Sequence, residues 1–230
     1  MAILLAHRGL WHPHHAAENT LPAFLAAAEA GYGVELDVRR AFDGSLVIQH
    51  DPPGGGPWSC PPYGETLEAL AQTACPMVAI NVKEEVYEPD LVVPVAKTGL
   101  LGRAFFFDQS VESSARLRRA AEGVKVLLRT SDRNEPANRA LTSEDLAPVW
   151  GAWVDQCDSD WATAELIRAI QAQGKTAWIV SPELHSREIN LAKLAEWREA
   201  DGICTDFPHL YGPLLADDER LTPRERWWND

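Results

Sequence analysis

The sequence of 230 residues has no long uninterrupted apolar run. Its apolar start, Ala2 to Ala6, gives way to Arg8, and no stretch approaches the roughly 20 apolar residues that span a bilayer. A secretory signal peptide would need a basic segment followed by about 7 to 15 apolar residues, a pattern that the amino terminus does not show. We therefore expect a cytoplasmic protein without stable membrane insertion.

Positive charge is also scarce. The chain has 21 Lys and Arg residues against 34 Asp and Glu residues, which gives a formal net charge of −13. Such a surface repels phosphate backbones and anionic lipids, so general binding to nucleic acid or to a membrane surface is not expected. An anionic substrate would need a local cation.

Cysteine is scarce as well. The four cysteines, Cys60, Cys75, Cys157 and Cys204, show no CxxC or Cys/His spacing. Their spacing indicates neither a zinc site nor a disulfide framework, and we expect buried free thiols.

What the chain does have is a regular alternation of short apolar runs and helical patterns. The runs are nearly continuously apolar, as in strands buried on both faces. We predict strands at Ile3 to Ala6, Gly33 to Val38, Met77 to Val82, Arg103 to Phe107, Val124 to Leu128, Ala152 to Val154, Thr176 to Val180 and Gly202 to Cys204. Helices are predicted at Leu21 to Ala30, Thr66 to Thr73, Pro89 to Lys97, Val111 to Glu122, Ser143 to Val149, Ala162 to Gln173 and Asn190 to Ala200.

Eight strands separated by seven helices, with a tail that can supply an eighth, predict an α/β fold of the closed (β/α)8 type, the TIM barrel. A doubly wound open sheet is the alternative, but the regular units carry no glycine-rich phosphate loop. No linker divides the chain, so we expect one domain over residues 1–230.

In such a barrel the carboxyl ends of the strands share one face, where the chemistry lies. Polar or ionisable residues occur at nearly every predicted strand end. They are His7 and Arg8, Glu35 and Asp37, His50 and Asp51, Asn81 and Lys83, Asp108, Arg129, Asp155, Glu183 and His185, and Asp206.

Glu35 and Asp37 are two residues apart on a predicted strand, so both carboxylates point to the same side. Inside a barrel they would repel each other unless a cation lay between them, and Mg²⁺ or Ca²⁺ is the natural choice. The alternative is an exposed edge strand that binds no ion.

Two histidines accompany this acidic pair at the predicted barrel mouth. His7 follows the first strand, and His50 follows the hairpin-like segment Ser45 to Gln49. An acid and a base that titrate near neutrality are what cleavage of a P–O bond requires. Arg8 and Lys83 add fixed positive charge that can bind a phosphate.

These residues resemble the signature of the glycerophosphodiester phosphodiesterase family. The resemblance rests on His7-Arg8-Gly9, Glu18-Asn19-Thr20, Ala23-Phe24, Glu35-Leu36-Asp37-Val38, Asp43-Gly44, Val47, His50-Asp51 and the closing segment Asp201 to Pro208. It implies a metal-dependent barrel that hydrolyses small phosphodiesters. It also implies that His7 and His50 are the acid/base pair, Arg8 binds phosphate, Glu35 and Asp37 bind the metal, and Asn19 orients the site.

The third strand departs from the family pattern. Where the family has a third metal-binding glutamate two residues before a lysine, this chain has Asn81 before Lys83. An amide oxygen can still bind a hard cation, but one negative charge is lost. Asp155 and Glu183 are therefore candidate ligands that could offset the loss, each with a solvated loop acid as the alternative.

The expected lid is short, because only Asp51 to Gly64 separates His50 from the next helix. Trp58, Tyr63 and Trp178 are candidate walls for the alcohol moiety of a substrate.

Two other functions stay open. One is a lipid phosphodiesterase of phospholipase C or D type, for which the tail Arg220 to Asp230 is the one segment that could touch an interface; the other is a binding barrel that has lost catalysis. The route of hydrolysis, by water or by a hydroxyl of the substrate, and the oligomeric state are not decided.

Overall fold

The computed structural model describes residues 2–12, 17–52, 60–84, 88–108, 111–133 and 141–215. Trp58, the tail from Arg220 and the side chain of Asp108 lie outside the described part. In chain order the elements are β1 (Ile3–Ala6), α1 (Leu21–Glu29), β2 (Gly33–Arg40), β3 (Leu46–Ile48), α2 (Tyr63–Ala71), β4 (Val78–Val82), α3 (Glu88–Lys97), η2 (Leu100–Arg103), β5 (Ala104–Asp108), α4 (Val111–Ala120), β6 (Val126–Ser131), α5 (Ser143–Leu146), β7 (Gly151–Asp155), α6 (Ala164–Gln171), β8 (Thr176–Val180), η3 (Pro182–His185), α7 (Leu191–Trp197), β9 (Gly202–Thr205) and α8 (Pro208–Leu215).

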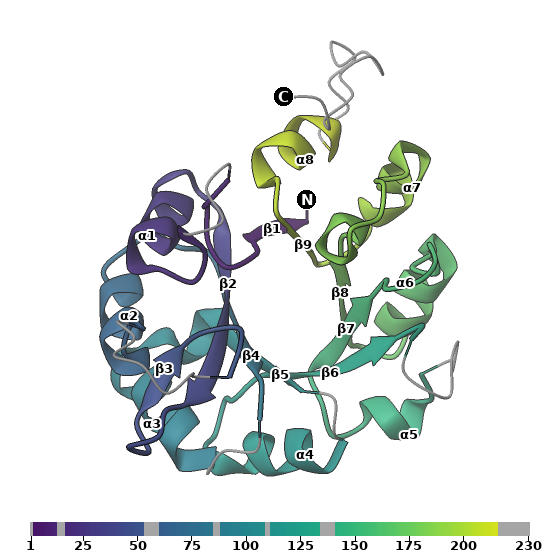
Figure 1. Ribbon diagram of the computed structural model, residues 1–230. Coiled ribbons are helices and arrows are strands. Elements are labelled where there is room, and N and C mark those ends of the chain that lie inside the picture. The colour runs from purple at the N-terminus through teal and green to yellow at the C-terminus, as the bar shows by residue number, and fades with distance from the viewer. Residues whose placement is uncertain are drawn as a thin grey trace.

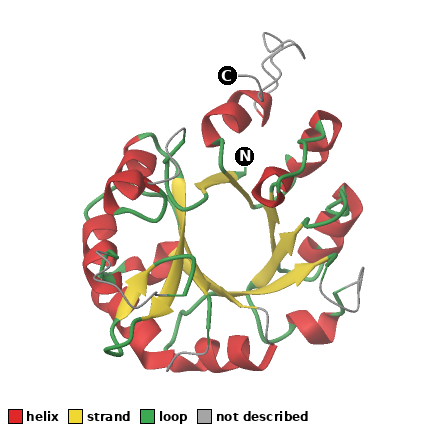
Figure 2. Cartoon of the chain, in the orientation of Figure 1, coloured by secondary structure: helices red, strands yellow, loops and turns green. Residues whose placement is uncertain are grey.

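Eight parallel strands form a closed ring, with the helices outside it (Figures 1 and 2). Strand β1 pairs with β9 on one side and with β2 on the other, which closes the barrel. The predicted (β/α)8 fold is confirmed. Strand β3 is the exception, because it pairs antiparallel with the end of β2, through Val38 with Ile48 and Arg40 with Leu46.

The first helix shows how local sequence positions the elements. The Thr20 side chain accepts a hydrogen bond from the backbone nitrogen of Ala23, and Pro22 occupies the first turn, as both do at helix starts. Gly31 follows the helix with a φ of 83°, in the left-handed region that glycine adopts at helix ends. The chain then enters β2 directly.

Residues of each strand alternate between the barrel interior and the helices. On β2, Val34 and Leu36 pack outward in a cluster with helix residues such as Phe24 and Leu67, so Glu35 and Asp37 face inward. A second outward cluster covers the other half of the ring, with Val154 and Ile179 among its members. The acidic pair is therefore interior by the same alternation that buries its apolar neighbours.

Aromatic rings fill the interior of the barrel. The rings of Phe107 and Trp153 stack with centroids 4.1 Å apart, and Phe105 lies 4.7 Å from Trp178. The Trp178 ring is packed against Gly202, where a Cβ would lie 2.2 Å from two ring carbons. This layer closes the barrel below its polar mouth.

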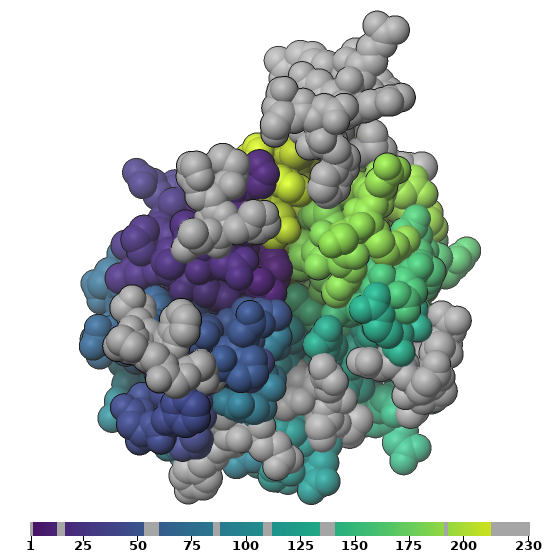
Figure 3. Space-filling view, in the orientation of Figure 1, coloured from purple at the N-terminus to yellow at the C-terminus, as the bar shows by residue number. Residues whose placement is uncertain are grey.

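Within the described residues, no helix is long and apolar enough to cross a bilayer. Figure 3 shows one face of the molecule, on which the first half of the chain, purple to blue, meets the second half, green to yellow.

Candidate active site

The turn after β1 shapes one wall of the site. Arg8 has a φ of 55°, a conformation uncommon outside glycine, and its backbone nitrogen donates to Glu35 Oε2 over 3.2 Å. Gly9 follows with a φ of 88°, and a Cβ there would lie 2.8 Å from Ala23. The sequence His7-Arg8-Gly9 thus requires a glycine for close packing against α1.

The Arg8 side chain holds two carboxylates. Its guanidinium lies 2.9 Å from Glu18 Oε1 through Nη1 and 3.2 Å from Asp37 Oδ2 through Nε. Because both contacts are partly or fully buried, the guanidinium is held in one orientation at the edge of the cavity, as recognition of a phosphate requires.

Asp37 is surrounded by donors. Asn19 Nδ2 donates to Oδ2 over 2.9 Å, Asn81 Nδ2 donates to Oδ1 over 2.8 Å, and Lys83 Nζ lies 3.5 Å from Oδ1. Asn19 has a φ of 53° and also accepts the backbone hydrogen of Asp37 through Oδ1. Asn19 therefore positions Asp37 from behind, and Asn81 presents its amide nitrogen to that carboxylate.

The two inward acids have opposite electrostatic character. Burial and the neighbouring charge of Asp37 raise the pKa of Glu35 to about 7. Burial also opposes ionisation of Asp37, but Lys83 and Arg8 outweigh it and hold the pKa of Asp37 below its ordinary value. Asp37 therefore favours the ionised form, whereas the nearby positive groups, His7 among them, offset the burial of Glu35 only in part.

This arrangement fits a hard cation. Among the described residues, Glu35 accepts a hydrogen bond on Oε2 alone, and its carboxyl group lines the same cavity as Asp37. Mg²⁺ and Ca²⁺ take carboxylate oxygens as ligands, and Glu35 Oε1 is such an oxygen beside a second carboxylate. Glu35 and Asp37 would hold the ion.

His7 is tied to the last strand of the ring. Its Nδ1 lies 2.7 Å from Asp206 Oδ1, and the backbone nitrogen of His7 donates to Thr205 over 3.0 Å. Burial lowers the pKa of His7, but the hydrogen bond with Asp206 and the charges of Glu35 and Asp206 outweigh it, so the pKa is raised. His7 therefore favours the protonated form.

His50 comes from outside the ring, at the end of the β2–β3 hairpin. Arg39 Nε donates to the His50 carbonyl over 2.7 Å, which anchors the residue, and His50 Nδ1 lies 2.9 Å from Asp51 Oδ1. The side chain is 38% exposed. Partial burial lowers the pKa of His50, because the opposing contributions of Asp37 and Asp51 are smaller.

These groups meet in one cavity of about 230 Å³ at the barrel mouth. Eight of the residues selected from the sequence line it: His7, Arg8, Glu35, Asp37, His50, Asn81, Lys83 and Asp155. The alternative of an exposed edge strand for the acidic pair is wrong, since Glu35 and Asp37 are 2% and 1% exposed.

Three other candidates do not line the cavity. Asn19 lies behind Asp37, as described above. Trp178 belongs to the interior aromatic layer, one step below Val180, which does reach the cavity. Glu183 is buried, and its carboxyl group accepts hydrogen bonds from Ser181 Oγ, Thr205 Oγ1 and, over 3.3 Å, the backbone nitrogen of Asp206.

Tyr63, considered as a wall, is buried in the outer core instead, and its hydroxyl donates to the Leu91 carbonyl over 3.0 Å.

Sequence reasoning assigned no role to several residues that the structure brings into the site. Phe107 and Trp153 form an aromatic wall, and Arg129 and His185, noted as polar strand ends, line the cavity with Asp155. Trp153 lies two residues before Asp155 on the same strand, so the sequence already indicated that both side chains point into the barrel. Asp206 was likewise noted without its partner His7.

The sequence between residues 7 and 85 matches the pattern of the Glycerophosphoryl diester phosphodiesterase family. No curated protein matches the sequence. Among solved structures, a protein from Galdieria sulphuraria proposed to be a glycerophosphodiester phosphodiesterase is 18% identical, with a TM-score of 0.78, covering 94% of this chain and 98% of its own.

Two further structures are similar. The glycerophosphodiester phosphodiesterase from Agrobacterium tumefaciens is 20% identical, with a TM-score of 0.69 and coverage of 92% of this chain and 99% of its own. A phosphodiesterase from Oleispira antarctica, solved with the product sn-glycerol-3-phosphate, is 18% identical, with a TM-score of 0.67 and coverage of 94% and 97%. At these identities the likeness establishes the fold.

The matched segment runs from His7 past Lys83, so it contains seven of the polar cavity residues: His7, Arg8, Glu35, Asp37, His50, Asn81 and Lys83. The predicted resemblance to the glycerophosphodiester phosphodiesterase family is confirmed over residues 7–85, and the solved structures share the fold along 92–94% of the chain.

Proposed function

We propose that the protein hydrolyses glycerophosphodiesters or similar small polar phosphodiesters, with a divalent cation and the histidine pair His7 and His50. The observation that carries this proposal is the single cavity in which both histidines face the Glu35–Asp37 pair beside Arg8 and Lys83. Acid, base, anion-binding groups and cation ligands are the four components that phosphodiester hydrolysis needs.

Arg8 and Lys83 bind the phosphate in this proposal. Both are fixed by Asp37, and both line the cavity, so their charge is oriented before substrate enters. The negative charge on the non-bridging oxygens grows as the P–O bond is attacked, and preorganised cations stabilise that state more than the ground state.

The cation completes the phosphate site. Glu35 and Asp37 would hold it, and when bound it supplies a Lewis acid that polarises a phosphoryl oxygen. Mg²⁺ and Ca²⁺ are both compatible with an oxygen donor set. The amide oxygen of Asn81 is a third candidate ligand, since its nitrogen donates to Asp37. Asp155, the candidate considered from the sequence, lines the opposite wall of the cavity, away from Glu35 and Asp37.

The environments of the two histidines suggest a division of roles. His7, held by Asp206, favours the imidazolium form and would be the acid that protonates the leaving alcohol. His50 is partly exposed and its lowered pKa favours the neutral form, so it would be the base that accepts the proton of the attacking hydroxyl. That hydroxyl belongs either to water or to the substrate itself, and release of a cyclic phosphate would identify the second route.

The size of the cavity favours a small substrate. About 230 Å³ is less than the roughly 300–1,000 Å³ of sites that enclose drug-sized ligands, which suits a polar diester head better than long acyl chains. The Oleispira antarctica relative was solved with sn-glycerol-3-phosphate, a small product of the same kind.

We also propose that the protein acts in the cytoplasm, because its net charge and lack of an apolar segment suit a soluble substrate.

A substrate panel tests the proposal. Turnover of glycerophosphocholine, bis-p-nitrophenyl phosphate and phosphatidylcholine vesicles is measured with Mg²⁺, Ca²⁺, Mn²⁺ or EDTA. We expect turnover of the small diesters that EDTA abolishes and a divalent ion restores. Preference for vesicles would favour a lipid phosphodiesterase, and no turnover with any pairing would favour a binding barrel.

Histidine variants test the roles. His7→Ala and His50→Ala should each lower kcat by about 10²–10⁴-fold. His209→Ala, a histidine on α8 that does not line the cavity, is the matched control and should retain turnover. Near-normal rates in both cavity variants would show that the histidine assignment is wrong.

A further inference from the structure

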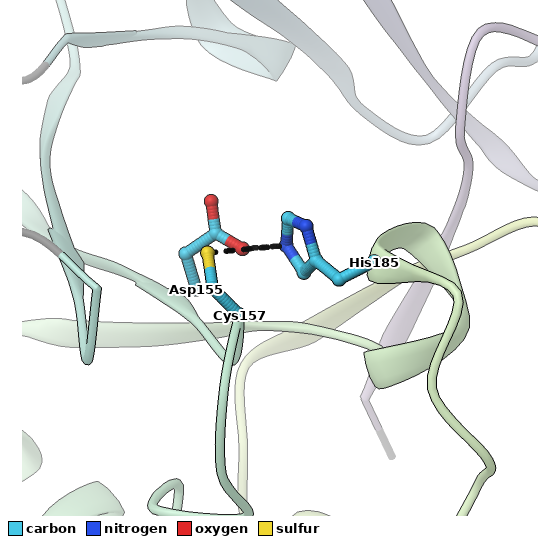
Figure 4. Close-up of side chains that lie close together, drawn as sticks. All are labelled: Asp155, Cys157 and His185. Atoms are coloured by element: carbon cyan, nitrogen blue, oxygen red, sulfur yellow. Dashed lines mark hydrogen bonds and ion pairs between the residues drawn. The ribbon is translucent and has the colours of Figure 1, made fainter.

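A carboxylate, a thiol and an imidazole lie close together on the far wall of the cavity. Asp155 ends β7, Cys157 follows two residues later, and His185 comes from η3 after the next strand (Figure 4). A carboxylate oxygen, the sulfur and a ring nitrogen all lie within 4.8 Å of one another. His185 Nε2 contacts Asp155 Oδ1 directly and lies 3.6 Å from Cys157 Sγ.

The two ligands that would be anions each receive hydrogen bonds from a fixed donor. Ser131 Oγ donates to Cys157 Sγ over 3.2 Å, and Arg129 Nε donates to Asp155 Oδ2 over 2.9 Å. Donors of this kind orient metal ligands and stabilise their negative charge. The other carboxylate oxygen, Oδ1, is the one that points to the histidine and the sulfur.

The cluster is buried on one side and open on the other. Asp155 and Cys157 are 3% and 6% exposed, and Asp155 and His185 line the same cavity as the phosphate-binding groups. In the ring, β7 lies four strands from β2 in either direction, so the cluster is diametrically opposite Glu35 and Asp37. Three protein ligands with an open side toward a cavity are the arrangement of a reactive metal site.

We propose that Asp155, Cys157 and His185 bind a transition-metal ion of the zinc class, separate from the hard cation at Glu35 and Asp37. A set of one nitrogen, one sulfur and one oxygen suits borderline-soft ions, whereas Mg²⁺ and Ca²⁺ take oxygen ligands. The two walls of the cavity therefore select different ions by ligand chemistry. The ion's fourth position faces the cavity, where a phosphate oxygen or water can occupy it.

The spacing of the cysteines along the chain cannot show such a site. Cys157 and Asp155 come from one strand end, but His185 comes from the loop after β8, which the β7–β8 pairing brings alongside. The competing explanation is a metal-free pair, in which Asp155 is held by Arg129 and binds His185, while the Cys157 thiol has no role in binding.

Cobalt substitution separates the two explanations. The full-length protein is stripped with EDTA, dialysed and titrated with Co²⁺ and with Zn²⁺. We expect one thiolate-bound equivalent, seen as a sulfur-to-cobalt charge-transfer absorption, and one tightly held zinc. Cys157→Ser should abolish the absorption, and His185→Gln should weaken zinc binding at least tenfold. Cys75→Ser, a buried thiol whose sulfur lies beside the Met77 carbonyl, is the control and should change neither result.

The double variant Glu35→Gln/Asp37→Asn should keep the cobalt–thiolate absorption, whatever happens to its hydrolase activity, so failure here is distinguishable from failure of the proposed function. Circular dichroism confirms that each variant folds. Absence of the absorption in the wild type, or its survival in Cys157→Ser, would overturn the proposal, as would zinc affinity that is unchanged in His185→Gln. Each of those results would favour the metal-free pair of Asp155 and His185 as the explanation of the cluster.

Discussion

Asn81 donates its amide nitrogen to Asp37 Oδ1 over 2.8 Å, at the position where the family resemblance implies a metal-binding glutamate. An amide forms a hydrogen bond with Asp37 here, whereas a carboxylate would repel it. The site would therefore offer a bound cation one negative charge fewer than a site with glutamate at this position.

Asn81→Glu should restore that charge. We expect Mg²⁺ or Ca²⁺ to bind roughly tenfold more tightly, equivalent to about 1.4 kcal/mol, because affinity in oxygen sites rises with ligand charge. The metal-free variant should unfold more readily than the wild type, since three inward carboxylates repel one another.

Isothermal titration calorimetry and thermal unfolding with and without EDTA measure both effects. Asn81→Gln, which has the length of glutamate without its charge, is the control. Equal affinity in all three proteins would show that residue 81 does not contact the ion.

Asp206→Asn should change the pH dependence of kcat. The hydrogen bond and charge of Asp206 raise the pKa of His7, so their loss lowers it. Because His7 acts in its protonated form, activity would fall at a lower pH on the basic side of the profile. Asp51→Asn is the control: Asp51 contributes least to the pKa of His50, so the acidic side should move little. A basic side that stays in place in Asp206→Asn would contradict the role of His7 as the acid.

Glu183→Gln should make stability less sensitive to pH. Burial raises the pKa of Glu183 above its ordinary value, so the folded state holds the proton more tightly than the unfolded chain. The stabilisation from that proton is complete below the unfolded pKa and is lost as the pH rises through the folded pKa. Relative to the wild type, the variant should therefore become more stable as the pH rises from about 4 to about 8.

Urea unfolding across this range provides the measurement, with Glu188→Gln, an exposed residue, as the control. If Glu183→Gln lost stability at high pH, Glu183 would instead be a charged group that the fold requires.

Gly202→Ala should destabilise the barrel floor. A Cβ at this position would lie 2.2 Å from the Trp178 ring and 3.0 Å from the Ile3 carbonyl, and neither neighbour can move freely. We expect a loss of roughly 1–3 kcal/mol in the free energy of unfolding. Gly64→Ala, where a Cβ meets nothing within 4 Å, is the control. Equal stability of the two variants would mean that the interior aromatic layer can repack.

Alternation along the strands made much of this structure predictable from the sequence. The inward position of Glu35 and Asp37 follows from a period of two, and the apolar runs located all eight barrel strands. Exact ends differed by a few residues: β6 runs to Ser131 rather than Leu128, because its last residues pair with Trp153 to Asp155 of β7.

Depth inside the barrel could not be predicted in the same way. Trp178 and Val180 have the same parity, yet Val180 lines the cavity and Trp178 lies one layer below it. Which layer a residue occupies depends on the stagger between strands, a property of the closed ring and not of one segment. For the same reason, the partnership of His7 with Asp206 and the cluster at His185 appear only in three dimensions.

The contact between His7 and Asp206 spans 199 positions of the chain, and it exists because β1 pairs with β9. His7 therefore gains its carboxylate partner only once β9 has paired with β1. A chain whose ring is still open contains Glu35, His50 and Lys83, but its His7 lacks that partner. If His7 is the acid, as we propose, the protein becomes competent for hydrolysis only at ring closure.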